Sequence, residues 1–246
     1  MNWLKQNWII ICIGGVVAAP VFIYTHSSSQ IYLYAWERPE DFSFLKDQSG
    51  VGIVFYAGDI VIKDNKIDTI LRRNSLKIPD GLKSIPLIRI DSFDSPDVLN
   101  KNKDNITKFI IQICGSFREC QIDFEARTSE YDFYINLMDG VHTALPNTKI
   151  SATALASWCS SPSFIDNLSA NIVVPMLYRM GKDSSRIKGG DVGSWFLSNS
   201  KCSDNIALST DELDFNHKRY SEGKSIYLFS PESWTRESFQ KALEEI

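Results

Sequence analysis

The stretch Cys120-Gln-Ile-Asp-Phe-Glu-Ala-Arg127 is typical of one buried strand that ends in charged side chains. Strand side chains alternate between two faces, so Asp123 and Glu125 are expected on the same face, about 7 Å apart. Such a pair either neutralises an arginine such as Arg127 or forms an acid/base pair in which burial and mutual repulsion raise one pKa. The stretch therefore predicts an ion network or the proton chemistry that glycosidic bond cleavage requires.

Short apolar runs like this one recur along the chain and alternate with helical patterns or other connections. Strands are expected at residues 31–37, 52–56, 85–91, 120–127, 150–158, 171–179, 205–209 and 224–229. Helices are expected at 96–113, from Ser129, at 190–199 and after a cap at Ser233, and a hairpin turn at Asp64-Asn65. About eight alternating strands predict a (β/α)₈ TIM-like barrel. An open sheet of six or seven strands is the alternative, but its usual glycine-rich phosphate loop is missing from the sequence.

Two regions are expected: residues 1–29 as a signal-anchor or transmembrane segment, and residues 30–246 as the barrel domain. Trp8 to Tyr24 is an uncharged, mostly apolar run of 17 residues, preceded by Lys5. This length lies at the lower limit of a membrane span. The positive-inside rule places Lys5 in the cytoplasm and the barrel outside it. Cleavage near Ser27 or Ser29 is the alternative.

Charge and cysteine patterns exclude several partners. The formal net charge is −4, and the Lys and Arg residues are dispersed. A nucleic-acid interface is therefore not expected. The cysteines lack the CxxC spacing and neighbouring histidines of a zinc site, so no metal is expected. With no nucleotide-binding loop either, no cofactor is expected.

Four cysteines follow residue 30, in what would be an oxidising compartment. Cys114 and Cys120 flank the turn into the key strand and are expected to form a disulfide. Cys159 follows one predicted strand, whereas Cys202 precedes another. That arrangement places them at opposite ends of a barrel, so a Cys159–Cys202 disulfide is not expected.

In a barrel of this kind the carboxyl ends of the strands meet at one end, where active sites are built. The residues near the predicted strand ends are acids, arginines and aromatics. We take as candidates Trp36, Glu37, Arg89, Asp91, Asp123, Glu125, Arg127, Trp158, Tyr178, Arg179, Asp211 and Glu212. Indole faces can stack on sugar rings, so this combination favours a carbohydrate ligand.

Seven blocks, in order along residues 31–246, resemble a bacterial domain-of-unknown-function family numbered 3142. They are Tyr34-Ala-Trp-Glu-Arg38, Leu87-Ile-Arg-Ile-Asp91, Gln121-Ile-Asp-Phe-Glu-Ala-Arg127, Thr153-Ala-Leu-Ala-Ser-Trp-Cys159, Val174-Pro-Met-Leu-Tyr-Arg-Met-Gly181, Leu208-Ser-Thr-Asp-Glu212 and Tyr227-Leu-Phe-Ser-Pro-Glu-Ser-Trp234. The resemblance implies a glycoside-hydrolase-like TIM barrel.

A more distant resemblance links two strands to family-18 chitinases. Ile122-Asp-Phe-Glu125 is similar to the last half of their Asp-x-Asp-x-Glu strand, and Met176-Leu-Tyr178 to their Met-x-Tyr strand. Gln121 replaces the first aspartate of that motif, and Arg179 stands where an aspartate is expected. Both departures count against substrate-assisted chemistry on N-acetyl sugars.

Two functions stay open. The first is a membrane-anchored, glycoside hydrolase-like protein with its barrel in the bacterial periplasm, acting on an envelope or secreted polysaccharide. Glu125 is its expected general acid/base, Asp123 tunes the pKa of Glu125, and Asp211 or Glu212 is the nucleophile or base. The other candidates bind substrate, with the arginines contacting acidic sugar groups or holding the carboxylates ionised. The alternative is a non-catalytic polysaccharide-binding or assembly protein.

Overall fold

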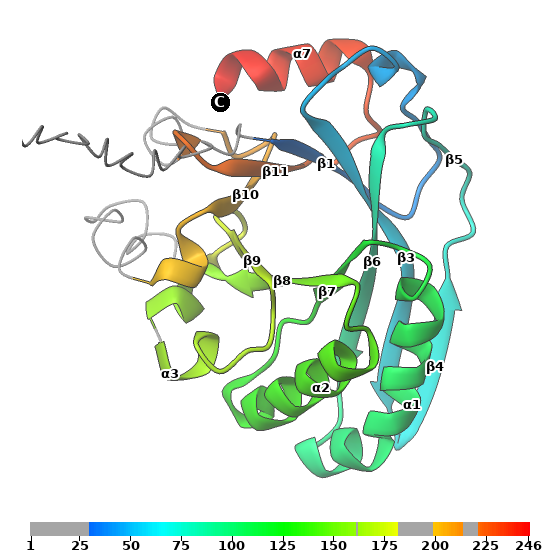
Figure 1. Cartoon of the computed structure of the whole chain (residues 1–246), viewed down its shortest axis with the longest axis vertical. Coiled ribbons are helices and arrows are strands. Elements are labelled where there is room, and N and C mark those ends of the chain that lie inside the picture. The colour runs from blue at the N-terminus through cyan, green and yellow to red at the C-terminus, as the bar shows by residue number, and fades with distance from the viewer. Residues whose placement is uncertain (1–29, 161, 182–198, 214–220) are drawn as a thin grey trace, which may run out of the picture.

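Eight parallel strands close into a barrel in the part of the chain that the computed structural model describes, residues 30–160, 162–181, 199–213 and 221–246 (Figure 1). They are β1 (Ile31–Ala35), β3 (Val51–Lys63), β6 (Lys83–Ser92), β7 (Glu119–Asp123), β8 (Lys149–Leu155), β9 (Ile172–Met176), β10 (Asn205–Ser209) and β11 (Ser225–Phe229). β1 pairs with both β3 and β11, which closes the barrel. The predicted TIM-like fold is thus confirmed, and the open sheet is excluded.

Helices cover the outside of the barrel. α1 (Pro96–Cys114) and α2 (Tyr131–Ala144) pack against each other (Figure 1). α3 (Pro162–Ile165) is a single turn, and α7 (Arg236–Glu245) ends the chain. The cap of α7 is Thr235, whose hydroxyl accepts from the backbone N–H of Ser238 at 3.1 Å, and not Ser233 as predicted. The helix predicted over 190–199 lies almost wholly outside the described residues.

Short elements make the remaining described connections. The 3₁₀ turns are η1 (Ser43–Leu45), η2 (Thr128–Glu130), η3 (Ala156–Ser160) and η5 (Ser200–Cys202), and β2 (Glu40–Asp41) pairs with β5 (Leu76–Lys77). η1 therefore stands where a strict (β/α)₈ barrel has its first helix. The helix expected from Ser129 starts at Tyr131 instead. Just before it, the Glu130 carboxylate accepts a hydrogen bond from the backbone N–H of Arg127 at 2.7 Å.

Alternate residues of each strand pack in two separate cores, as expected for strands buried on both faces. The barrel interior is filled by Tyr32, Tyr34, Val54, Ile85, Leu87, Val174, Ala207 and Tyr227. The opposite strand faces, including Ile122, pack under the helices. These side chains fill the middle of the barrel between its two ends.

β3 and β6 run beyond the barrel and carry a hairpin there. β3 turns at Asp64 and Asn65, whose φ angles are 54° and 58°, and returns antiparallel as β4 (Lys66–Leu71). This confirms the predicted hairpin. A side chain at Gly58 would place its Cβ 2.5 Å from the Ile70 carbonyl oxygen, so glycine is required where the pairing begins.

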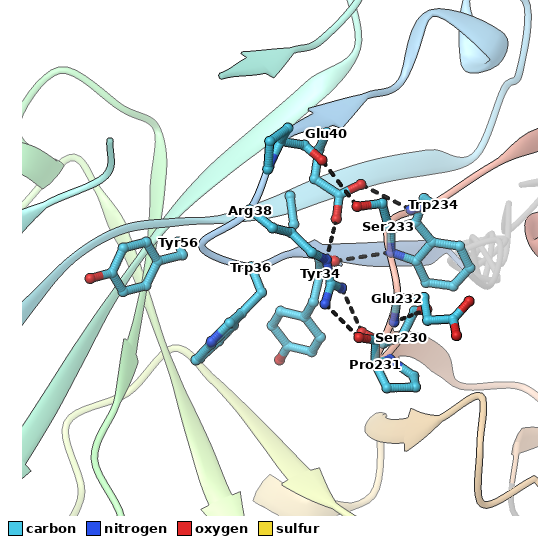
Figure 2. Close-up of polar contacts among 12 residues, drawn as sticks. Tyr34, Trp36, Arg38, Glu40, Tyr56, Ser230, Pro231, Glu232, Ser233 and Trp234 are labelled. Carbon is cyan, nitrogen blue, oxygen red and sulfur yellow. Dashed lines mark hydrogen bonds and ion pairs between the residues drawn. The ribbon is translucent and has the colours of Figure 1, made fainter. Parts of the chain in front are cut away.

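The loop after β1 is fastened to the loop after β11 (Figure 2). Arg38 donates from Nε to the Glu40 carboxylate at 2.8 Å. Its other nitrogens donate to the carbonyl oxygens of Ser230 at 2.6 Å and Pro231 at 2.8 Å. The ion pair with the fully buried Glu40 side chain orients the Arg38 guanidinium, whose hydrogen bonds join the two loops where β1 meets β11.

Trp234 adds two further hydrogen bonds between the β11 loop and the β1 region. Its backbone N–H donates to Glu40 at 2.9 Å, and its indole Nε1 donates to the Tyr34 carbonyl oxygen at 3.0 Å (Figure 2). The side chain is 4% exposed. Trp234 is therefore an internal anchor, and its indole face is closed to a ligand.

Two disulfides are present, and one of them corrects the sequence prediction. Cys114–Cys120 forms as expected. Cys159–Cys202 also forms, with the Cα atoms 6.0 Å apart. β8 ends at Leu155, earlier than predicted, and the chain then turns outward through η3. η3 and η5 both contact β9 from outside the barrel, which brings Cys159 and Cys202 together.

Among the described residues, no helix has both the length and the apolar character needed to cross a membrane. The run from Trp8 to Tyr24 lies outside those residues, so its role as an anchor stays a prediction.

Candidate functional site

A cavity of about 520 Å³ opens at the carboxyl end of the barrel strands. Its walls come from six of the eight strands and the loops that follow them. They are Tyr34, Trp36, Leu87, Arg89, Ile90, Asp91, Asp123, Glu125, Thr153, Leu155, Ala156, Ser157, Met176, Tyr178, Arg179, Met180 and Phe229. A concave site with apolar walls and a few converging polar groups is typical of small-molecule and oligosaccharide binding.

Seven of the twelve predicted site residues line this cavity. They are Trp36, Arg89, Asp91, Asp123, Glu125, Tyr178 and Arg179. The small residues predicted for β8 and the turn after it also contribute, because Thr153, Ala156 and Ser157 leave the room that larger side chains would fill. The other five candidates lie elsewhere and are described below.

Asp123 is the last residue of β7 and points into the cavity. Burial raises the pKa of its carboxyl group to about 6. The Thr153 hydroxyl, which donates to Asp123 at 2.6 Å, lowers this pKa, and the negative charge of Glu125 raises it. Asp123 therefore retains a proton at a pH where most carboxyl groups have lost theirs.

Glu125 follows β7, where the backbone N–H of Ala126 donates to the Phe124 carbonyl at 2.9 Å and turns the chain sharply. Its side chain is exposed in the cavity. Glu125 has no hydrogen-bond or ion-pair partner in the described part of the chain. The ion-network interpretation needs an arginine beside Glu125, and none of the arginines in the described ranges pairs with it.

Arg127, predicted to bind substrate, points away from the cavity. Its guanidinium donates to Glu130 at 2.6 Å and to the Asp94 carbonyl at 2.6 Å. Since the strand ends at Asp123, the alternation expected to bring Arg127 to the mouth stops before reaching it. Arg127 is reassigned as a residue that fastens the start of η2.

Arg89 lies between two carboxylates. It donates to both oxygens of Asp59 at 3.0 and 2.9 Å and pairs with Asp91 at 3.0 Å. Burial raises the pKa of Asp91, although Arg89 acts to lower it. With two acids around it, Arg89 is not a free cation for an acidic sugar, and its guanidinium faces the Trp36 ring at 5.8 Å.

Arg179 stands at the rim with a left-handed backbone, φ 52°. Such a conformation costs roughly 1 to 2 kcal/mol in a residue with a side chain. The carboxylate of Glu212 accepts the Arg179 N–H at 3.1 and 3.2 Å, and Asp211 pairs with the guanidinium at 3.7 Å. These contacts stabilise the strained backbone and hold the guanidinium over the Phe229 ring, 5.0 Å away.

Asp211 and Glu212 were predicted as a nucleophile or base across the barrel. Neither lines the cavity, and both contact Arg179. Ser209 also donates to Asp211. We therefore reassign both acids as residues that position Arg179.

Trp158 and Glu37 are the two remaining corrections. Trp158 is 3% exposed and meets Phe164 edge to face at 5.0 Å, because η3 has carried it outside the barrel. Glu37 accepts the backbone N–H of Arg73 at 3.0 Å and the Asn74 side-chain amide at 2.8 Å. Burial acts to raise the pKa of Glu37, but these donors outweigh it and the pKa is lowered. Trp158 is thus closed to a ligand, and Glu37 is not among the residues that line the cavity.

Arg72 was missed by the sequence prediction. Its guanidinium donates to the carbonyl oxygens of Ala35, Trp36, Arg38, Tyr56 and Asn74. It thereby holds the loop that places Trp36 on the cavity wall. A single arginine in an irregular loop leaves no sequence pattern from which this role could be inferred.

Tyr34 and Phe229 are cavity residues that were also missed. The Tyr34 hydroxyl donates to Gln121 at 2.9 Å, so the buried Gln121 serves as an acceptor. Burial raises the pKa of Tyr34 and of Tyr178, which keeps both as neutral hydroxyl groups. Phe229 stacks on Tyr178 with ring centroids 5.6 Å apart. Their inward positions follow from period-two alternation in β1 and β11.

In the described ranges, no group of three or more histidine, cysteine or acidic residues is arranged to hold a metal ion.

Replacing Asp123 by asparagine is expected to stabilise the fold at pH 7.5 by on the order of 2 kcal/mol. The folded pKa of Asp123, about 6, is higher than its value in the unfolded chain. The stability linked to its proton is therefore fully present below about pH 4 and is lost as the pH rises through about 6. Urea unfolding at pH 4, 6 and 7.5 should show a higher free energy of unfolding for Asp123→Asn than for the parent protein only at the two higher pH values. An advantage that is the same at all three pH values contradicts the assignment.

Solved structures with similar barrels were found by comparison of folds. One is a fungal endo-β-N-acetylglucosaminidase of glycosyl hydrolase family 18, with a TM-score of 0.52 and 10% identity over 82% of this chain and 90% of that chain. Another is the spore cortex-lytic enzyme SleL of Bacillus cereus, with a TM-score of 0.43 and 15% identity over 74% of this chain and 50% of that chain. No protein-family model and no curated protein sequence matches the chain, so the resemblance to family 3142 stays a prediction. The chain has a glycoside-hydrolase-like TIM-barrel fold.

Proposed function

We propose that this protein is a glycoside hydrolase that cleaves an envelope or secreted polysaccharide with Asp123 and Glu125 as its acid/base pair. One observation carries the proposal: a carboxyl group with a pKa of about 6 and a second acid, exposed and unpaired among the described residues, line the same cavity. General acid/base catalysis of glycoside cleavage needs such a pair in different environments. The fold likeness supports the proposal without showing the chemistry.

The two acids have separate tasks in this proposal. Glu125 reaches into the cavity and donates a proton to the leaving glycosidic oxygen as the C–O bond breaks. When Glu125 carries the proton of the pair, Asp123 carries the remaining negative charge beside the developing positive charge on the sugar. Water then bonds to the anomeric carbon, and its proton passes to the Glu125 carboxylate, which restores the acid. Trp36 supplies an aromatic wall for a sugar ring, and Tyr178 a neutral hydroxyl.

A second candidate function is polysaccharide binding without cleavage, as in an assembly protein. It is favoured by the placement of Asp211 and Glu212, which hold Arg179 instead of facing the cavity. It is also favoured by Asp91, whose carboxylate is paired with Arg89 at 3.0 Å. On this interpretation Asp123 and Glu125 bind sugar hydroxyls.

Incubation of the full chain with a panel of polysaccharides tests the proposal. The panel includes polymers of N-acetylglucosamine, because the fungal structure of similar fold is an endo-β-N-acetylglucosaminidase. New reducing ends with at least one polymer support hydrolysis. Retention on a polymer without new reducing ends supports the binding protein. If no polymer is cleaved and none retains the protein, both functions are rejected.

We also propose that residues 8–24 anchor the barrel at the outer face of a bacterial inner membrane, in the periplasm, as the apolar run suggests. The full chain is then expected to partition into the detergent phase, and residues 31–246 alone into the aqueous phase. Detergent phase separation of both proteins, with the N-terminus sequenced, checks this. Full chain with an intact N-terminus in the aqueous phase contradicts the anchor, whereas a chain cut near Ser29 indicates the cleaved periplasmic form.

A further inference from the structure

Beyond the rim of the barrel, β3, β4 and β6 continue as a three-stranded sheet. Their pairing aligns residues in rows: Ile70 with Asp59 and Arg89, then Asp68 with Val61 and Asp91, then Lys66 with Lys63. Phe93 continues the β6 side of the last row, because its backbone N–H donates to the Ile62 carbonyl at 2.9 Å. Paired residues share a face of a sheet, so these side chains lie on one surface.

The two faces of this extension differ. One face carries Ile60, Ile62, Ile88 and Ile90, which are buried in the core beneath α1. The other face carries the alternate residues of the same three strands. We call this second face the platform, and it comprises Asp59, Val61, Lys63, Lys66, Asp68, Ile70, Arg89, Asp91 and Phe93.

Three of the nine platform side chains, Val61, Ile70 and Phe93, are apolar, on a kind of face that is normally polar where it meets solvent. Four large hydrophobic residues are exposed among those described, and three of them fall in this extension. Phe93 is 64% exposed and Ile70 is 37% exposed, both on the platform. Leu71, 56% exposed, is next to Ile70 in β4 and therefore points to the opposite face.

The platform is continuous with the cavity. Arg89 and Asp91 belong to both, since each lines the cavity and lies in a platform row. From Arg89 to Phe93 the strand rises about 13 Å. A chain that leaves the cavity along β6 would therefore pass Asp91 and reach the Phe93 ring.

The charges on the platform balance. It holds three cations, Lys63, Lys66 and Arg89, and three carboxylates, Asp59, Asp68 and Asp91. Arg89 is itself paired with Asp59 and Asp91. A surface of this kind offers hydrogen-bonding groups and apolar contacts without a net field, so it suits an uncharged ligand.

We propose that the platform binds an uncharged polysaccharide chain as it leaves the cavity, so that the ligand is a polymer and not a short oligosaccharide. This proposal rests on the carbohydrate function proposed above. One side of a sugar ring presents C–H groups, which pack against the negative face of an aromatic ring such as Phe93. The sugar hydroxyls then lie within reach of the charged side chains in neighbouring rows.

Chain-length dependence of binding tests the platform. The full chain with Glu125→Gln, which prevents consumption of the probe, is titrated calorimetrically with a disaccharide and a hexasaccharide of each of four polymers. Two are neutral, β-1,4-linked N-acetylglucosamine and β-1,4-linked glucose, and two are charged, β-1,4-linked glucosamine and an oligouronate. We expect the hexasaccharide of a neutral polymer to bind about tenfold tighter than its disaccharide.

Phe93→Ala is expected to remove most of that tenfold advantage and to leave disaccharide binding unchanged. Leu71→Ala is the matched control, since it removes a similarly exposed apolar side chain from the opposite face of the same extension. Equal effects of the two variants, no advantage of any neutral hexasaccharide, or an advantage only for a charged one would overturn the proposal. These affinities are informative even if the protein does not hydrolyse any polymer, because a binding protein would still show the dependence on chain length.

Discussion

Glu125→Gln is expected to lower hydrolysis by about 10²- to 10⁴-fold and to leave the melting temperature nearly unchanged. Glutamine keeps the volume of glutamate but has no acidic proton to give to the leaving oxygen. No fold-stabilising contact is lost, because Glu125 has no hydrogen-bond or ion-pair partner among the described residues. Turnover of the hydrolysed polysaccharide and thermal melts are measured on the same preparations of full chain.

Glu130→Gln is the matched control for this result. Glu130 is a glutamate of the same segment, but it is buried and accepts from both the guanidinium and the backbone N–H of Arg127. Its replacement is expected to lower stability by roughly 1 to 3 kcal/mol and to leave turnover of the folded protein unchanged. If Glu125→Gln instead lowers stability and keeps full turnover, Glu125 is a structural acid and the binding-protein interpretation is favoured.

The barrel could be predicted because its strands are buried on both faces. Such strands appear in a sequence as short apolar runs, and Gly52-Ile-Val-Phe-Tyr56 is one of them. The hairpin was predictable as well, since Asp64-Asn65 suits a turn with two positive φ angles. The boundaries were less accurate: β8 ends at Leu155, although the apolar pattern continues to Trp158. Apolar residues that pack outside the barrel look the same in the sequence as residues of the strand.

Cavity residues were predictable where they belong to a strand or directly follow one. Arg89, Asp91 and Asp123 lie inside strands, so period-two alternation and the common direction of parallel strands suffice to bring them together. Predictions failed where the chain turns away before the residue is reached. Trp158 and Arg127 are the two examples, and in both the strand ends earlier than predicted.

Pairings made by loops could not be predicted from periodicity. Arg72 contacts carbonyl groups from three separate segments, and Glu212 supports Arg179 from 33 residues away. Each contact depends on where an irregular loop passes in space. No short-range pattern in the sequence records that path. The mechanistic proposal changes accordingly, because the acids expected across the barrel are used to hold an arginine.

The Cys159–Cys202 disulfide also depends on the path of irregular segments, so periodicity did not predict it. Its contribution to stability is expected to be large. It closes 43 residues of chain, whereas Cys114–Cys120 closes only 6. In the chain-entropy account, a cross-link stabilises by restricting the unfolded chain, more so for a longer loop. For these lengths it predicts about 4 kcal/mol for Cys159–Cys202 and about 2 kcal/mol for Cys114–Cys120.

Replacing both members of each pair by alanine tests this difference. All four cysteines are fully buried in the same core, so the cost of lost packing is similar for the two double variants and largely cancels in the comparison. Urea unfolding of the full chain should therefore show Cys159→Ala/Cys202→Ala to be less stable than Cys114→Ala/Cys120→Ala by about 2 kcal/mol. Peptide mapping of the unreduced parent protein should recover both cross-links. Free thiols at Cys159 and Cys202 would show that η3 and η5 do not meet on β9. Equal losses of stability with both cross-links present would contradict the chain-entropy account for this protein.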